Sequence, residues 1–167
     1  MMKAGRLGLA LGLLAATSAC GLRPIYAGGA NGAVAQGLAA VEVSPIEGQE
    51  GWLVRNALED RLGQANVSVT PRYRLDVLLD DELEGLGLLT DDTIGRERRT
   101  LRARYQLVDL DSGMIMVDAT AGSDAGIDVV SSEYATIAAE QTALENLAQQ
   151  VADRIVSRLT LALSEPQ

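Results

Sequence analysis

Two runs of acidic residues are the first candidates for catalytic chemistry in this chain of 167 residues. Asp80, Asp81 and Glu82 form one run, and Asp91 and Asp92 form the other. A pair of facing carboxylates can act as acid and base in glycoside hydrolysis. A chain with 23 acidic residues brings such pairs together by chance, and neither run has the spacing of a calcium loop. We therefore expect a solvated acidic surface and no catalytic residue.

The residue types that are missing exclude several other sites. The chain contains no histidine and one cysteine, so a Ser-His-Asp triad, a Cys-His pair and the usual zinc sites cannot form. Gly85-Leu86-Gly87 lacks the third glycine and the following helix of a dinucleotide-binding loop. The formal net charge of -9 argues against nucleic-acid binding. We expect no metal, no cofactor and no nucleic-acid partner.

The single cysteine, Cys20, stands where an export signal ends. Lys3 and Arg6 precede a run of ten apolar or glycine residues at 7–16, which is shorter than the about 20 residues that span a bilayer. Small residues at 17–19 then lead into Cys20, a pattern that resembles the signal of a bacterial lipoprotein whose cysteine is acylated. The alternative is an ordinary signal peptide that leaves Cys20 as a free thiol.

Three segments follow from this interpretation. Residues 1–19 are the signal peptide, residues 20–37 are a lipidated N-terminus with a Gly/Ala-rich tether, and residues 38–167 are a single domain. Lipoproteins retained in the inner membrane resemble one another in carrying aspartate directly after the cysteine, whereas this chain has Gly21. We therefore expect a protein that is lipid-anchored to the outer membrane on its periplasmic side.

The domain alternates strand and helix patterns. We expect strands at 38–46, 72–82, 95–109 and 114–121, and helices at 52–62 (capped by Gly63) and 132–163. In the strands, the side chains expected to face inward are Tyr73, Leu75, Val77, Leu79, Leu101, Ala103, Tyr105, Leu107, Ile115 and Val117. The apolar stripe of the last helix begins at Ile137. This order predicts an α+β fold with a mostly antiparallel four-stranded sheet and two helices packed on one face.

A small transmembrane barrel is the architecture to weigh against this fold. Such barrels carry girdles of aromatic residues on their lipid face. The only aromatic residues here are Trp52 and four tyrosines, and a long amphipathic helix ends the chain. These features exclude the barrel.

Arginines concentrate on two of the predicted strands, at positions 72, 74, 96, 98, 99, 102 and 104. One plausible antiparallel register places Asp76, Asp80 and Glu82 opposite Arg102, Arg98 and Arg96, as ordinary ion pairs. The same register leaves Arg74 opposite Arg104, with Arg72 beside them and no acid facing them. Like charges placed opposite each other are destabilising, so this register predicts an anionic partner. The candidate anion-binding residues are Arg72, Arg74, Arg102 and Arg104.

Three leucines, Leu86, Leu88 and Leu89, lie in a glycine-containing connection between these strands. If they are exposed, they form a small apolar patch of the kind that marks a partner contact. If the segment folds back, they belong to the core. The sequence leaves both possibilities open.

Two short stretches resemble a known family. Residues 20–26 (CGLRPIY) resemble the start of mature LptE-type lipopolysaccharide-assembly lipoproteins. Residues 41–46 (VEVSPI), followed by 53–58 (LVRNAL), resemble that family's first strand and first helix. The resemblance implies a two-helix, four-stranded body inside the lumen of an LptD-type outer-membrane β-barrel. It also implies a role in lipopolysaccharide insertion, with lipid A phosphates as the anion that the arginines bind.

Two other functional classes remain open. One is an auxiliary periplasmic lipoprotein of a lipid-transporting ABC system, which would share the signal and an α/β body. The other is a carboxylate-based envelope enzyme. Co-purification with inner-membrane transport components would indicate the first, and substrate turnover that depends on one acid would indicate the second.

Overall fold

One four-stranded sheet organises the chain. The computed structural model describes residues 32–63, 69–88 and 94–164, so Cys20 and the predicted signal lie outside the described residues. The elements in order are α2 (Ala33–Ala39), β1 (Val41–Val43), α3 (Gly48–Leu62), β2 (Tyr73–Leu88), β3 (Ile94–Asp109), β4 (Ile115–Asp128) and α4 (Glu133–Ser164). The strand order is β1-β2-β3-β4, with β1 parallel to β2 and the other neighbours antiparallel. The predicted α+β class is confirmed, but the sheet is mixed and α2 is a third helix.

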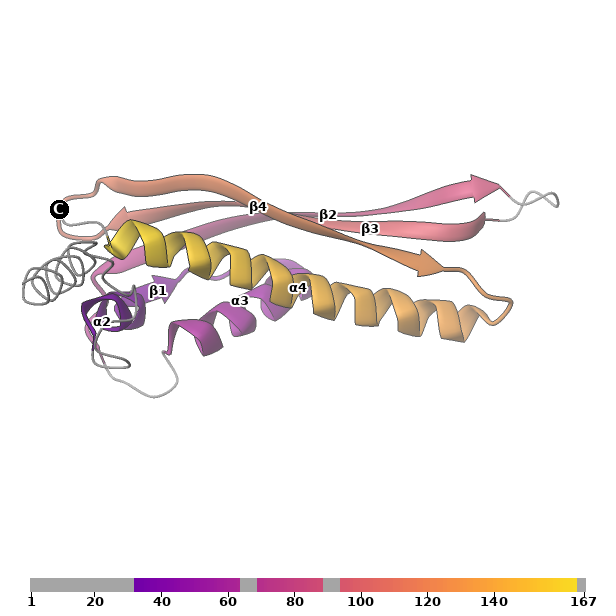
Figure 1. Ribbon diagram of the computed structural model, residues 1–167, viewed down its shortest axis with the longest axis horizontal. Coiled ribbons are helices and arrows are strands. Elements are labelled where there is room, and N and C mark those ends of the chain that lie inside the picture. The colour runs from indigo at the N-terminus through magenta and orange to yellow at the C-terminus, as the bar shows by residue number, and fades with distance from the viewer. Residues whose placement is uncertain (1–31, 64–68, 89–93, 165–167) are drawn as a thin grey trace, which may run out of the picture.

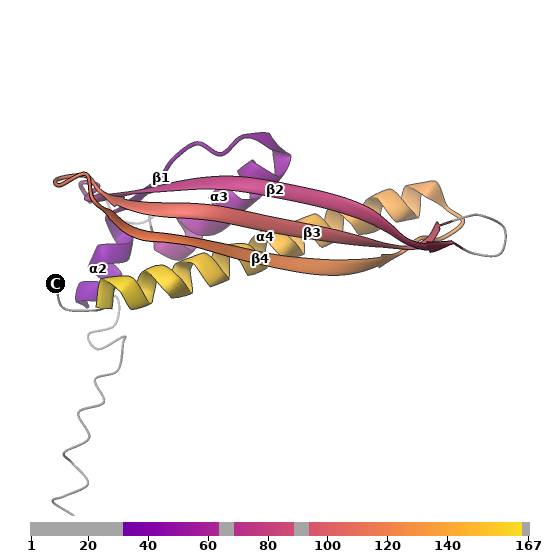
Figure 2. The same ribbon diagram turned by 90° about the horizontal axis from the view of Figure 1, so that it is seen from above.

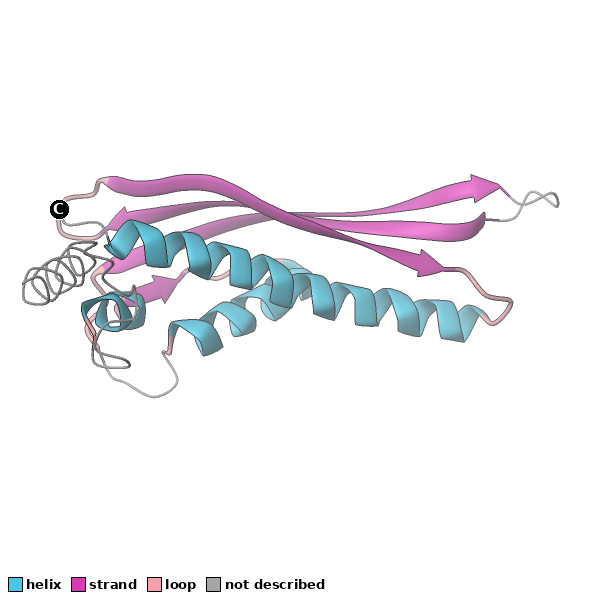
Figure 3. Cartoon of the chain, viewed as in Figure 1, coloured by secondary structure: helices cyan, strands magenta, loops and turns pink. Residues whose placement is uncertain are grey.

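The helices lie on one face of the sheet, which we call the inner face (Figures 1 and 2). Helices α3 and α4 run side by side there: Gln49 donates to Gln141 at 3.0 Å, and Arg61 donates to Gln149 at 2.8 Å. The opposite, outer face is not covered by any element in the described part of the chain (Figure 3). No helix in the described ranges is long and apolar enough to cross a membrane.

Period-two alternation buries the inward side chains as the sequence predicts. The sheet contributes Tyr73, Leu75, Leu101, Ala103, Tyr105 and Leu107, each at most 5% exposed. The facing stripe of α4 contributes Leu144, Leu147, Val151, Ile155 and Leu159. Alanines on β4 (Ala119, Ala121) and on α4 (Ala148, Ala152) pack in the same core, where small side chains let the helix approach the sheet closely.

Helix α3 ends where its sequence predicts. Gly63 adopts the left-handed conformation, with φ of 75°, and its backbone N–H donates to the carbonyl of Glu59. Glycine reaches this conformation without a steric cost, which makes it the usual residue just after a helix. The predicted C-cap is therefore confirmed, although the helix begins at Gly48 rather than at Trp52.

Two inward positions were predicted wrongly. Ile137 is 55% exposed. It lies one turn before Gln141, which contacts Gln49 near the start of α3, so α3 does not extend far enough to cover it. Ile115 is 54% exposed, because the register shifts between Leu107 and Val108 and adds one residue to β4. This bulge places Ile115 opposite Val108 on the outer face, while Val117 stays buried.

The start of the domain also differs from the prediction. The expected strand at 38–46 shrinks to Val41–Val43, and the last part of the expected tether forms α2. This helix packs at the C-terminal end of α4, where a Cβ on Gly37 would be in ordinary van der Waals contact with Leu163, 3.5 Å from its Cδ1. Leu38 is buried in the resulting contact. Packing against α4, rather than side-chain bulk within the segment, therefore orders these residues.

Removing one core leucine from α4 tests this packing. Leu147 is 0% exposed, so Leu147→Ala should lower the free energy of unfolding by about 2–5 kcal/mol through lost burial and a residual cavity. Leu161, in the same helix but 46% exposed, is the matched control, and Leu161→Ala should cost about 0.5 kcal/mol or less. Urea denaturation measures both. Equal losses for the two variants would contradict the placement of the core.

Candidate functional site

The outer face of the sheet carries the arginines that the sequence singles out. Arg74 and Asp76 lie on β2, Arg102 and Arg104 lie on β3, and Asp118 lies on β4. All five side chains project to the outer face, as the period-two pattern predicts. Arginines and acids are interspersed over this surface, so it is charged in both senses rather than uniformly basic.

The predicted register of the β2–β3 hairpin is wrong by four residues. Asp80 pairs with Arg102 rather than with Arg98, and Glu84 faces Arg98. Strand β2 continues to Leu88, so the connection between the strands comes later than the predicted end at Glu82. A shift by an even number of residues keeps every side chain on its predicted face but changes all of its cross-strand partners.

The cluster of unpaired arginines therefore does not form. Val108, not Arg104, lies opposite Arg74, and Arg74 Nη2 lies 2.9 Å from Asp76 Oδ2 on its own strand. Arg104 lies opposite Leu78 and reaches across to Asp118 on β4 at 3.1 Å. These acids neutralise two of the four arginines that were predicted to meet an anion.

Arg72 has local partners as well. Its Nε lies 3.7 Å from Asp109, and its guanidinium lies over the ring of Tyr73, 5.3 Å from the centroid. The side chain is 55% exposed and lies just before β2, at the end of the sheet that carries α2. It is therefore separate from the arginines in the middle of the outer face.

Arg102 differs from the other three candidates. Within the described ranges its guanidinium forms no ion pair, although Asp80 and Gly122 lie opposite it on the two neighbouring strands. A Cβ on Gly122 would lie 3.2 Å from Arg102 Cγ, so glycine leaves room for the arginine stem to lie against β4. Arg102 is thus held by its aliphatic stem while its charged group remains available.

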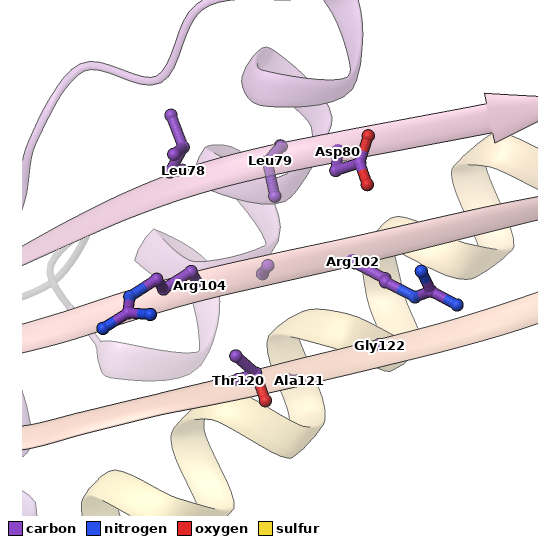
Figure 4. A pocket seen from close by; sticks show the side chains of 9 residues that line it. Leu78, Leu79, Asp80, Arg102, Arg104, Thr120, Ala121 and Gly122 are labelled. Carbon is purple, nitrogen blue, oxygen red and sulfur yellow. The ribbon is translucent and has the colours of Figure 1, made fainter.

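Arg102 borders a shallow groove of about 410 Å³ on the outer face (Figure 4). Leu78 of β2, Arg104 of β3 and Thr120 of β4 also line it. Leu78 is 73% exposed and does not contribute to the core. The guanidinium groups of Arg102 and Arg104 point apart in Figure 4. The groove therefore holds the exposed Leu78 opposite Arg104, and Arg102 farther along it opposite Asp80.

The inner face holds a second charged group, Arg99, whose role the sequence analysis missed. Arg99 Nη2 lies 2.6 Å from Asp81, and Arg99 Nη1 donates to the backbone carbonyl of Glu140 on α4 at 3.1 Å. The hydrogen bond from Arg99 to Asp81 raises the pKa of the guanidinium. Arg99 shares its parity with Leu101, and Asp81 shares its parity with Leu79, which is the signal that would have placed both inward.

The predicted partner-contact leucines are only partly accounted for. Leu86 is a strand residue opposite Arg96 and is half-buried, not part of a connecting loop. Leu88 ends β2, but its side chain and the whole of Leu89 lie outside the described residues. The prediction of a connection at 85–89 is therefore corrected as far as Leu88. Among the described residues, no group of acids or cysteines is arranged to hold a metal ion.

Comparisons with known proteins agree with this fold. The family model LptE, described as lipopolysaccharide-assembly, matches residues 38–159. A solved structure of a putative lipoprotein from Caulobacter crescentus aligns with a TM-score of 0.67 and 24% identity, over 80% of this chain and 97% of its own. The rare lipoprotein B from Shewanella oneidensis aligns with a TM-score of 0.52 and 15% identity, over 72% and 92% of the two chains.

A third solved structure, a minor lipoprotein from Acinetobacter baumannii, aligns with a TM-score of 0.55 and 14% identity, over 72% of this chain and 88% of its own. At these identities, the structural alignments establish a shared fold. No curated protein matches the chain by sequence. The family match, by contrast, covers most of the domain.

The ion pair that neutralises Arg74 predicts a small dependence of stability on pH. Hydrogen bonds from Arg74 and from Ser44 lower the pKa of Asp76. The contribution of Asp76 to the free energy of unfolding is therefore complete above the pKa of the unfolded carboxyl group, about 3.9. It is lost as the pH falls through the lower pKa of the folded state. Asp76→Asn should destabilise the protein at neutral pH, and its deficit should shrink below about pH 4.

Chemical denaturation of both proteins at several pH values measures this difference. The effect should be modest, because the Asp76 side chain is 40% exposed and solvent screens the pair. A deficit that stays constant between about pH 7 and about pH 2 would contradict the role given to Asp76.

Proposed function

This chain belongs to the LptE family of lipopolysaccharide-assembly lipoproteins, and from that membership we propose that it is an outer-membrane lipoprotein anchored through acylated Cys20. Its body occupies the lumen of an LptD-type β-barrel, supports the assembly of that barrel and helps lipopolysaccharide reach the cell surface. The family match over residues 38–159 carries this proposal. The family is non-enzymatic, and we assign no catalytic residue.

The dimensions of the body fit a barrel lumen. Helix α4 has 32 residues and is about 48 Å long at 1.5 Å per residue. A bilayer with its headgroups is about 40–45 Å thick. Strands β2 and β3 run beside α4 along the long axis (Figure 2). A body of this length can extend through a barrel from one membrane surface to the other.

The outer face has the chemistry of a surface that meets the wall of a barrel. The lumen of an outer-membrane barrel is polar, unlike its lipid-facing exterior. The outer face carries Arg104 with Asp118, Arg74 with Asp76, and Thr120 opposite Arg104. Mixed charges and hydroxyl groups of this kind form hydrogen bonds and ion pairs with a polar wall.

The groove beside Arg102 supports direct contact with lipopolysaccharide. Lipid A combines phosphate groups with acyl chains, and the groove is lined both by arginines and by the exposed Leu78. Arginine binds a phosphate through two parallel hydrogen bonds. Of the four arginines first considered, Arg102 keeps its guanidinium without an ion pair in the described part of the chain. We therefore place the phosphate contact at Arg102 and an apolar contact at Leu78, which lies opposite Arg104 in the same groove.

Reversing this charge tests the phosphate contact. Arg102→Glu should weaken lipopolysaccharide binding by about tenfold or more, because a charge-assisted hydrogen bond contributes about 1.5–3 kcal/mol and tenfold corresponds to about 1.4 kcal/mol. Fluorescence titration with labelled lipopolysaccharide measures the affinity. Arg158→Glu makes the same charge change on the exposed surface of α4 and should leave binding nearly unchanged. Equal weakening in both variants would show that only net charge matters.

Detergent extraction and affinity purification of the lipidated chain test the partner. The chain should co-purify with an outer-membrane β-barrel, identified by mass spectrometry, because the proposed assembly places the body in the barrel's lumen. Recovery of inner-membrane transport components in its place would support an auxiliary lipoprotein of a transporter and would contradict the proposal.

A further inference from the structure

Three parts of the chain meet at one end of the molecule. Helix α2, through which the chain enters the described body, the turn between β3 and β4, and the C-terminal end of α4 lie together in both views (Figures 1 and 2). Leu110 N–H donates to the carbonyl of Arg72 at 2.9 Å, and Arg72 lines a pocket with Gly37 of α2 and Leu163 of α4. The turn and the entry point of the chain therefore belong to the same end.

The turn exposes apolar side chains. Leu110 is 43% exposed, Met114 is 62% exposed and Ile115 is 54% exposed. The bulge in β4 contributes to this, because it moves Ile115 from the inner face to the outer face. Three large apolar side chains are thus exposed within six residues of one hairpin turn, and exposed apolar groups gathered in this way mark contacts with a partner or a membrane.

The turn is held rigidly in this form. Asp109 Oδ1 accepts hydrogen bonds from the backbone N–H of Asp111 at 3.1 Å, and from the N–H and hydroxyl of Ser112 at 2.8 and 2.9 Å. Gly113 adopts a φ of 71°, which glycine reaches without strain. With its backbone fixed in this way, the turn keeps Leu110 and Met114 away from the core.

The length of the preceding chain places this end near the lipid anchor. Gly32 is the twelfth residue after Cys20, and a random coil of twelve residues spans roughly 19 Å on average and at most about 43 Å. The opposite end of α4 lies about 48 Å further along the helix. A membrane that holds Cys20 is therefore within reach of the β3–β4 turn and farthest from the other end of the body.

We propose that the β3–β4 turn inserts Leu110, Met114 and Ile115 into the lipid surface that holds the acylated Cys20. This inference rests on the anchor in the proposed function. The contact is apolar rather than electrostatic, since the turn carries the exposed acid Asp111 and the whole chain has a formal net charge of -9. The turn therefore inserts into the headgroup and upper acyl region of neutral lipids.

Insertion also fixes the orientation of the body. A lipid anchor alone does not set the angle between the rod and the membrane. A second contact at the turn restricts that freedom. It holds the end that carries α2 outside the barrel's lumen, against the leaflet that contains the anchor, while the rest of the body occupies the lumen.

An environment-sensitive fluorophore on the turn tests the proposal. Acylation of Cys20 leaves the mature chain without a free thiol, so Met114→Cys provides a single site for an NBD label. The lipidated full chain is reconstituted into phosphatidylcholine vesicles. NBD emission at this position should shift to the blue and rise, and lipids that carry a quencher near the headgroup should reduce it.

Ser131→Cys is the matched control, because it places the same label on an exposed loop at the opposite end of the body. Its emission should remain that of a label in water. Replacing Leu110 and Ile115 by serine in the Met114→Cys background should reverse the blue shift. Leu110→Cys is the second labelling site if Met114→Cys fails to fold, as judged by its melting temperature.

Water-like emission at Met114 on vesicles, equal to that at Ser131, would overturn the proposal. A blue shift that needs the purified barrel would assign the turn to a protein contact, and one seen in vesicle-free buffer would assign it to a second copy; each result overturns lipid insertion. Intact-mass measurement of Cys20 separates these outcomes from a failure of the anchor itself, which would show an unmodified thiol.

Discussion

The packing of one long helix against the sheet is the interaction on which the rest of this structure depends. Strands β2 and β3 have 16 residues each, about 53 Å at 3.3 Å per residue, whereas α3 has 15 residues and extends about 22 Å. Only α4, among the described helices, follows the strands over most of their length. Its leucines and Ile155 are buried where the strands present apolar residues. Beyond Leu101, where the sheet turns polar, Arg99 joins Asp81 and the Glu140 carbonyl and holds the helix.

This arrangement explains why the outer face is available for function. The described helices all pack on the inner face, so the apolar residues of the strands are used there. The outer face keeps charged pairs that cost little to expose and contribute little to folding. Such a surface can bind a polar wall without destabilising the free protein. The groove on this face is lined both by Arg102, which forms no ion pair in the described part of the chain, and by the exposed Leu78.

The sequence predicts which residues face inward far better than it predicts which residues meet. Alternation placed Tyr105 and Leu107 inside and Arg104 outside, and an error of four residues in the register preserves those faces. The register itself depends on where the hairpin turns. Gly85 and Gly87 suggested an early turn, but pairing with β3 extends β2 through both of them. Because cross-strand ion pairs depend on the register, the same error wrongly placed Arg74 opposite Arg104.

Two further features could not be predicted because they depend on distant contacts. The bulge that exposes Ile115 has no turn residue to signal it, and it arises from the fit of β4 against β3. Helix α2 lacks the bulky residues of an amphipathic pattern, and its contact with Leu163 across the fold stabilises it. The family relationship, in contrast, rests on short motifs that the sequence shows directly, and the match over residues 38–159 confirms it.

Site-specific photo-crosslinking from the outer face tests the central claim most directly. A benzophenone side chain at Thr120, in the groove of the outer face, is activated in cells that carry the assembled outer membrane. The proposed assembly predicts a covalent adduct between this chain and an outer-membrane β-barrel, identified by mass spectrometry. An adduct with an inner-membrane component, or none at all from a folded and lipidated chain, would contradict it.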